Sequence, residues 1–215
     1  MPPPAGPRKI AVPPLPSGSA VKLLEALESR RAVRDFAADA IGEPVLNELV
    51  RAAAAAPSYM NLQPWTFAVV SDPLTVARLG ERALQHQHLK PHELEGFRLA
   101  HGGDGLPSHS AFYNAPALIV IYANDEGRHA EYGCAMAAQS LMLAAQTMGL
   151  GTCWISQAQP FLNSPAMKKA FGVPLNCKVI APIIVGCPSG QPLSPGRRQP
   201  DIHWVRPRVL DAVEA

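Results

Sequence analysis

Residues 45–70, VLNELVRAAAAAPSYMNLQPWTFAVV, set the organisation of the chain, because they predict a helix, a polar loop and a buried strand in direct succession. The helix is predicted to begin at Glu43-Pro44, since proline suits the first turn of a helix, and to stop before Pro57. The strand is predicted over WTFAVVS, residues 65–71. Pro57 and Pro64 restrict the backbone of the loop that joins them.

The polar residues of this loop allow two interpretations. Ser58, Asn61 and Gln63 follow one another closely. They could form a structural turn in which an Asn side chain bonds its own backbone. Alternatively, the amides of Asn61 and Gln63 could contact the edge of a flat heterocycle, because each offers both donors and acceptors. The loop residues alone leave both interpretations open.

The other predicted elements follow no regular β-α-β order, so the sequence predicts an α+β fold, with one domain over residues 19–215. Further helices are predicted for AVKLLEALESRR after Ser19, LTVARLGERAL after Asp72-Pro73 and AMKKAF after Ser164-Pro165. Further strands are predicted for ALIVIYAN, TCWIS and VIAPIIVG. Residues 134–151, CAMAAQSLMLAAQTMGLG, are apolar on nearly every side, which predicts a long helix in the centre of the fold or in a dimer interface, ended by Gly149 and Gly151. The stretch from Gln85 to Tyr113 keeps no period and predicts a long, partly helical loop.

Composition argues against several classes of protein. The 215 residues are 47% hydrophobic and 17% charged, which is typical of a globular protein. A net charge of +2 gives no basis for nucleic-acid binding, and polar residues within the long apolar helix argue against a membrane span. Segment 1–18, MPPPAGPRKIAVPPLPSG, lacks the apolar core of a signal peptide and is expected to be a loose proline-rich arm. The four cysteines form no CxxC pair, so we expect buried free thiols in a cytoplasmic protein.

Arginines gather at two places. Arg30, Arg31 and Arg34 lie at the end of the first predicted helix, in SRRAVRDF, and Arg197 and Arg198 lie in the C-terminal tail. Such cations could complement the helix dipole and remain in water, or they could hold the oxygens of a phosphate. No motif of a metal centre, a phosphate-binding loop or a hydrolase nucleophile accompanies them. We therefore expect a bound cofactor, and no metal, to supply the reactivity.

Three stretches of the chain together resemble the nitroreductase family of FMN flavoproteins. Residues 28–70 resemble its opening signature, Arg-Arg-x-x-Arg-x-Phe, a helix, and then Ala-Pro-Ser-x-x-Asn-x-Gln-Pro-Trp entering a strand. AAQSLMLAAQTMGLGTCWIS resembles the family's central helix and the following strand. VIAPIIVGCPSG and GRRQPDIHWV resemble its closing strand and arginine-bearing tail. The resemblance covers about residues 20 to 206.

The resemblance implies a helix-flanked sheet in an intertwined homodimer, with FMN bound at the subunit interface. The arginines of one subunit would hold the FMN phosphate, and the Pro57–Asn61 loop of the other would approach the flavin ring. Arg34 would lie near the N1/C2-carbonyl edge of the ring, and a backbone N–H of the Trp154–Ser156 stretch would point at N5. The FMN-contacting residues implied in this way are Arg30, Arg31, Arg34, Pro57, Ser58, Tyr59, Asn61, Gln87, Lys90, Trp154, Ile155, Ser156, Arg197 and Arg198.

The activity implied by the resemblance is a two-step reduction. NADH or NADPH would reduce the flavin and leave, and a small acceptor such as a nitroaromatic or a quinone would then be reduced. Other chemistry known in the family stays open, namely reductive dehalogenation, enone reduction and flavin fragmentation, as does a non-catalytic flavin-binding protein. Two residues depart from the family pattern. Ala32 replaces a phosphate-binding Ser, and Tyr59 replaces a small residue, which would narrow the site or add a stacking surface.

Overall fold

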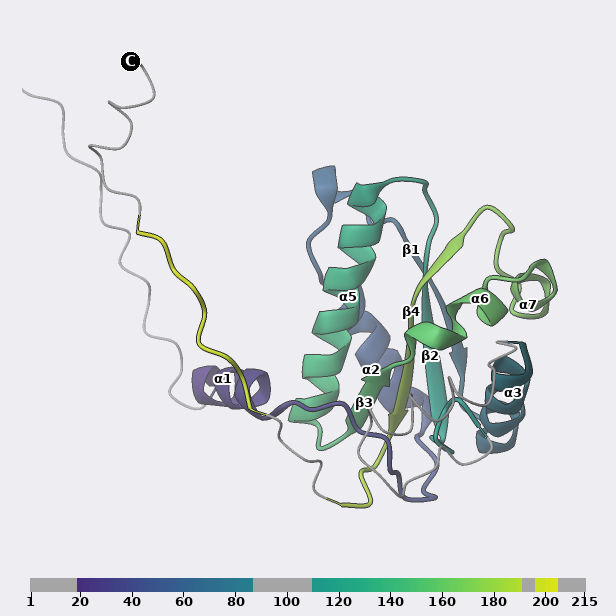
Figure 1. Cartoon of the computed structure of the whole chain (residues 1–215), viewed down its shortest axis with the longest axis horizontal. Coiled ribbons are helices and arrows are strands. Elements are labelled where there is room, and N and C mark those ends of the chain that lie inside the picture. Colours follow the sequence, from purple (N-terminus) through teal and green to yellow (C-terminus); the bar gives the residue numbers. More distant parts are fainter. Residues whose placement is uncertain (1–18, 87–109, 191–195, 205–215) are drawn as a thin grey trace, which may run out of the picture.

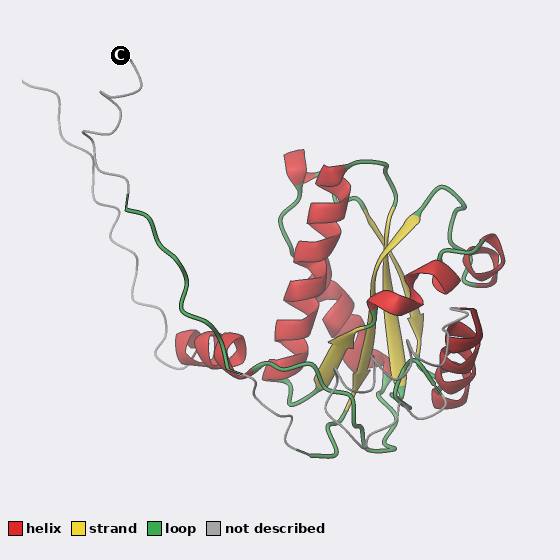
Figure 2. Ribbon diagram, in the orientation of Figure 1, coloured by secondary structure: helices red, strands yellow, loops and turns green. Residues whose placement is uncertain are grey.

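The fold consists of one antiparallel sheet between two layers of helices (Figure 2). The computed structural model describes residues 19–86, 110–190 and 196–204. The proline-rich segment 1–18, together with Gln87 and Lys90, lies outside these described residues. The strands are β1 (Trp65–Val70), β2 (Ala117–Ala123), β3 (Gly151–Trp154) and β4 (Lys178–Gly186). The α-helices are α1 (Ser19–Ser29), α2 (Glu43–Ala54), α3 (Pro73–His86), α5 (Arg128–Thr147), α6 (Gln159–Leu162) and α7 (Pro165–Ala170), with short 3-10 helices η1 (Tyr59–Asn61) and η2 (Ser156–Ala158).

The sheet has the strand order β1-β2-β4-β3, and every neighbouring pair is antiparallel. Both faces of β2 are buried, because its side chains alternate between two hydrophobic clusters. Ile119 and Ile121 pack under α2 and α5, whereas Leu118, Val120 and Tyr122 pack under α3 and α6. Figure 1 shows α2 and α5 on one side of the sheet and α3, α6 and α7 on the other.

The predicted helix starts are confirmed where a cap or a proline marks them. Helix α2 begins at Glu43 with Pro44 in its first turn and buries Leu46, Leu49 and Ala53. Helix α3 begins at Pro73, and the carboxylate of Asp72 accepts a hydrogen bond from the N–H of Thr75 at 2.8 Å. Bonds from the Thr75 side chain and backbone lower the pKa of Asp72. The α+β class is therefore confirmed, together with the helix-loop-strand unit of residues 43–70.

Helix α5 starts earlier than predicted, and helix α1 forms as predicted but exposes its leucines. Helix α5 begins at Arg128, six residues before Cys134, and it packs one face on the sheet while Tyr132 and Met136 stay exposed. Helix α1 leaves Leu23, Leu24 and Leu27 between 41% and 60% exposed. The physical reason is that, among the described elements, α1 contacts mainly the C-terminal end of α5 (Figure 1), so the described residues do not cover its apolar face.

The cysteine prediction is confirmed with one difference. All four thiols are free, and Cys134, Cys153 and Cys177 are buried, but Cys187 is only half-buried. Burial raises the pKa of Cys134 to about 12, which keeps this thiol protonated. Within the described residues, no helix is both long and apolar enough to cross a bilayer.

The segment that follows α1 joins the edge of the sheet. Ala32 forms a parallel bridge with Thr152, and the N–H of Val33 donates to the carbonyl oxygen of Thr152 at 3.0 Å. Gly151 makes this approach possible, because a Cβ at Gly151 would lie 2.7 Å from the Cβ of Val33. Gly149 ends α5 as predicted, with a left-handed φ of 75°. Gly151, in contrast, lies in β3, where its missing side chain leaves space for Val33. The bridge holds Arg31 and Arg34 beside β3.

We expect Gly151→Ala to lower the free energy of unfolding by about 1–3 kcal/mol, because the added methyl group overpacks the contact with Val33. Urea denaturation of the purified variants measures the difference. Gly190→Ala is the control, since a Cβ at Gly190 meets no atom within 4 Å. Equal stability of the two variants would contradict this account of Gly151.

Candidate functional site

The arginines form a cluster where α1 ends. Arg30 is half-buried, and burial together with the charges of Arg197 and Arg31 lowers its pKa. Arg197 therefore lies close to Arg30 in the same chain, although the two are far apart in the sequence. Arg198 is exposed. Arg31 donates hydrogen bonds to the carbonyl oxygens of Glu28 at 2.6 Å and Arg30 at 2.9 Å, which hold its side chain near the end of the helix.

Arg34 lies over a tyrosine that the sequence did not point to. The Cζ atom of Arg34 is 6.0 Å from the centre of the Tyr113 ring, a distance typical of a cation-π contact. Burial raises the pKa of the Tyr113 phenol, and Arg34 partly offsets that increase. Tyr113 and Asn114 both have φ of 54°, a left-handed conformation that is uncommon outside glycine. Tyr113 therefore belongs to the site, and no local pattern links it to Arg34.

Cys153 is a second residue that sequence reasoning missed. It is 2% exposed on β3, next to Trp154. Burial raises the pKa of its thiol, and the charges of Arg34 and Arg30 partly offset the increase. The thiol is thus a buried, neutral group near Arg34 and Arg30. Ala32, one of the two departures from the family pattern, contributes a backbone bridge here, and its side chain is exposed.

Trp154, Ile155 and Ser156 lie at the end of β3 and the start of η2. The indole N–H of Trp154 is buried and has no hydrogen-bond partner within the described residues. The N–H of Ile155 donates to the carbonyl oxygen of Pro182 at 2.8 Å. The Ile155 amide is therefore already used, and of this stretch only Trp154 and Ser156 could offer a backbone N–H to a ligand.

The loop from Pro57 to Pro64 is held by its own hydrogen bonds. The hydroxyl of Ser58 accepts a bond from the N–H of Gln63 at 2.9 Å, and the Gln63 side chain donates to Oδ1 of Asn61 at 3.3 Å. Met60, Asn61 and Gln63 have φ between 48° and 56°. Three left-handed residues in such a short stretch store backbone strain, which is typical of functional loops. The loop presents Asn61 and Gln63 at the surface.

Tyr59 of the same loop stacks on His129 at the start of α5. The ring centres are 4.3 Å apart, and the planes differ by 17°. Tyr59 is nevertheless 53% exposed, so the pair forms an aromatic surface at this end of the molecule.

Within one chain the arginine cluster and this loop lie at opposite ends of α5. Ser58 packs beside Gly133 in the first half of the helix, where a Cβ on Gly133 would lie 3.6 Å from the Cβ of Ser58. Ser29 accepts a hydrogen bond from Gln146 near the other end at 3.2 Å. Gly133 and Gln146 are between three and four helical turns apart, roughly 20 Å at 1.5 Å per residue. The fold therefore does not bring the two groups together in a single chain.

Comparison with known proteins gives a consistent result. The model of the family described as "Nitroreductase family" matches residues 27–187. A candidate NADH dehydrogenase/NAD(P)H nitroreductase from Archaeoglobus fulgidus is 26% identical over 173 residues, which cover 78% of this chain and 86% of that protein. The 5,6-dimethylbenzimidazole synthase of Rhodospirillum rubrum is 29% identical over 184 residues, covering 74% and 78%. A crystal structure of a nitroreductase with bound FMN from Bacteroides fragilis superposes with a TM-score of 0.71 at 27% identity, covering 86% of this chain and 98% of that one.

Proposed function

Because the chain belongs to the nitroreductase family, we propose that it is an FMN-dependent oxidoreductase that uses NADH or NADPH to reduce an electron-poor acceptor such as a nitroaromatic or a quinone. The Bacteroides fragilis structure, which contains FMN, supports the choice of cofactor. The observation that carries the proposal is the cluster of half-buried Arg30 and Arg31 with the exposed Arg197, whose charge acts on Arg30.

The arginine cluster fits the phosphate of FMN. Burial and two neighbouring cations depress the pKa of Arg30, so its guanidinium is less stable there than in water. A phosphate would reverse both effects, because it brings negative charge and accepts the hydrogen bonds of the guanidinium. Arg30 and Arg198 are proposed as the main phosphate ligands, and Arg31 and Arg197 as supporting residues. The proximity of Arg197 to Arg30 supports a role for the tail.

The ring of the flavin is proposed to lie over the end of β3. Arg34 would stabilise negative charge at the N1/C2-carbonyl edge, and its contact with Tyr113 would hold the guanidinium in place. The buried indole N–H of Trp154 supports a ligand here, because a buried donor without a partner is costly. FMN, when bound, supplies the hydride chemistry between the nicotinamide and the acceptor. The contribution of the chain is to bind, orient and polarise the ring.

We further propose that two copies of the chain build each site. Pro57, Ser58, Tyr59 and Asn61 of one subunit would face the arginines of the other, since within one chain they are too far apart. The exposed apolar side chains of Leu23, Leu24 and Leu27 on α1 support a dimer, because a second subunit would cover them. The Tyr59–His129 pair would then offer a flat aromatic acceptor a surface for stacking.

The proposed function predicts a yellow protein whose visible flavin bands bleach under anaerobic NADH or NADPH. The measurement is a spectrum of the purified protein before and after each nicotinamide. A protein that binds no flavin even after FMN is added would overturn the proposal. Flavin that stays oxidised with both nicotinamides would favour a non-catalytic flavin-binding protein or another electron donor.

One alternative is supported by a particular relative. The chain is similar to a 5,6-dimethylbenzimidazole synthase, and the flavin ring system contains a dimethyl-substituted benzene ring like that of dimethylbenzimidazole. Fragmentation of the flavin itself is therefore the second candidate function. Irreversible loss of the flavin absorbance in reduced protein exposed to oxygen would identify it, whereas full recovery of the oxidised spectrum would favour the reductase.

A further inference from the structure

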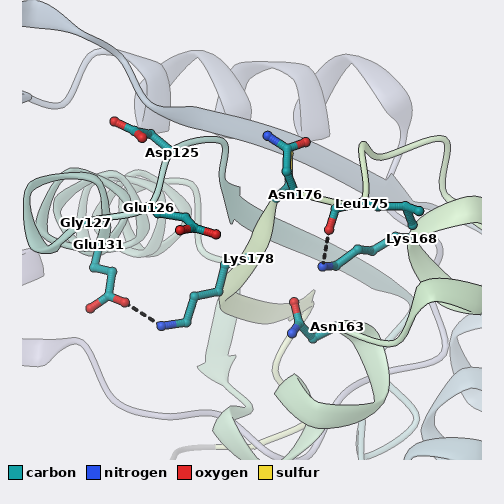
Figure 3. Close-up of a pocket in the computed structure, with 10 residues that line it drawn as sticks. Asp125, Glu126, Gly127, Glu131, Asn163, Lys168, Leu175, Asn176 and Lys178 are labelled. Atoms are coloured by element: carbon teal, nitrogen blue, oxygen red, sulfur yellow. Dashed lines mark hydrogen bonds and ion pairs between the residues drawn. The ribbon is translucent and has the colours of Figure 1, made fainter.

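A pocket with a volume of about 450 Å³ opens at the end of the sheet away from the arginine cluster. Its walls come from the loop before α5, the connection between α6 and α7, and the turn before β4. The volume falls within the range of roughly 300–1,000 Å³ that is common for small-molecule sites. Figure 3 shows carboxylates of Asp125, Glu126 and Glu131 on one side and Asn163, Lys168 and Asn176 on the other, with Lys178 between them.

Lys168 is the unusual residue of this pocket. It is 7% exposed, and within the described part of the chain it is the one charged side chain that is buried. Its ammonium donates to the carbonyl oxygen of Leu175 at 2.8 Å, and no carboxylate of the described residues lies within 4 Å of it. An ammonium has three donors, and a buried charge is costly unless it is paired. Lys168 therefore has capacity for an anionic partner on the pocket side.

Asn163 adds an oriented donor on the same wall. Its Oδ1 accepts a hydrogen bond from the N–H of Val179 at 3.2 Å, so that oxygen is already used. The NH₂ group of the amide is thereby directed elsewhere and remains available as a donor. Figure 3 shows Asn163 and Lys168 on the same side of the pocket, away from Asp125 and Glu131. Together the two side chains offer the donors that a carboxylate needs.

The opposite wall has the reverse charge. Glu131 is paired with Lys178 at 2.5 Å, which leaves Asp125 and Glu126 as acidic groups without a cation in the described ion pairs. Within the described residues, these acidic side chains do not gather closely enough to form a metal site. An ammonium group of a ligand would be attracted to this wall, whereas a ligand with two negative ends would be repelled.

From these charges we infer that the pocket binds a small amine-bearing carboxylate with its two charges at opposite ends. The carboxylate would bind Lys168 and Asn163, and the ammonium would face Asp125 and Glu126. The pocket lies at the end of α5 that also carries the Tyr59–His129 stack, but none of the residues that line it is among those proposed to contact the flavin. The inference therefore rests on the charges of the pocket and uses no flavin contact.

The test is a calorimetric titration of the full-length protein at constant ionic strength with three probes of matched length. We expect 6-aminohexanoate to bind saturably. Hexanoate and hexylamine are each expected to bind with an affinity at least roughly tenfold lower, since each lacks one charged end. Equal binding of hexanoate and 6-aminohexanoate would overturn the role of the acidic wall. Absence of saturable binding of 6-aminohexanoate would overturn the site itself.

Two variants assign the binding to this pocket. Asn163→Asp keeps the oxygen that accepts from Val179 but replaces the free donor with a second oxygen, and Lys168→Met keeps the buried stem but removes the charge. Each is expected to weaken 6-aminohexanoate binding roughly tenfold or more. Lys169→Met is the control, because Lys169 is the exposed neighbour on the same helix. Binding that survives both Asn163→Asp and Lys168→Met would come from another place, such as the arginine cluster, and would overturn the assignment.

Discussion

Arg30→Ala is expected to yield a nearly colourless protein in which FMN binds roughly 10- to 150-fold more weakly, because the variant loses a charge-assisted bond to phosphate that is worth about 1.5–3 kcal/mol. The guanidinium of Arg30 is half-buried beside Arg31 and Arg197, and its pKa is lowered first by burial and then by these two positive charges. Without FMN the substitution removes a repulsive partner. The apoprotein is therefore expected to stay folded, and the loss of colour would not come from unfolding.

The measurement for Arg30→Ala is a fluorescence titration of apoprotein with FMN, with a urea curve of each apoprotein to compare stability. Arg51→Ala is the matched control, since Arg51 lies on α2, its side chain is 77% exposed, and it pairs with Glu48 at 3.1 Å. Equal FMN affinity in the Arg30→Ala variant and the unmodified protein would contradict the assignment of the FMN phosphate to the arginine cluster. A loss of affinity in both arginine variants would indicate a general effect of charge.

Mixed dimers give the second large expected effect. Arg30→Ala damages the arginine half of the site, and a Ser58→Ala/Asn61→Ala double variant damages the loop half. If each site combines the arginines of one subunit with the loop of the other, a mixed dimer contains one site with both defects and one intact site. In the isolated mixed dimer about half of the sites are therefore expected to recover FMN binding and reductase activity, against about a quarter in an unseparated equal mixture.

Co-expression of two differently tagged chains, followed by two affinity steps, isolates the mixed dimer for this measurement. The control is the pair Arg30→Ala and Arg197→Ala, because both residues lie in the same cluster of one chain. That pair has no intact site and is expected to show no recovery. Recovery in neither pair would argue that a single chain completes its own site, and equal recovery in both would argue against the division into these halves.

The local elements could be predicted because their signals are short-range. Asp72-Pro73 marks the start of α3 through a cap that involves only Thr75, three residues further on. The continuous apolar run of β2 indicated a strand, and the structure shows that both faces of this strand are buried. The start of α5 was placed too late, since Arg128 and Glu131 are polar and the apolar pattern becomes dense only at Cys134. A pattern of apolar residues cannot reveal polar first turns.

The residues of the candidate site also divide into those that short motifs point to and those that only tertiary packing reveals. Arg30, Arg34 and Asn61 could be proposed from short motifs, because each motif keeps its own spacing along the chain. Tyr113 and Cys153 could not, because they reach Arg34 only through the packing of separate elements on the sheet. Lys168 could not be distinguished from Lys169 in the sequence, and only burial separates the two.

By itself, the sequence determined the α+β class through caps and apolar periods, which depend on neighbours within a few residues. The resemblance of three stretches to a known family pointed to the nitroreductase family, which the family model confirms, and implied the residues proposed to contact the cofactor. The tertiary structure alone decided that the arginines and the Ser58 loop lie at opposite ends of α5. That separation depends on long-range contacts, the packing of Val33 against Gly151 at one end and of Ser58 against Gly133 at the other. No local pattern encodes it, because each contact joins segments that meet only after the chain has folded.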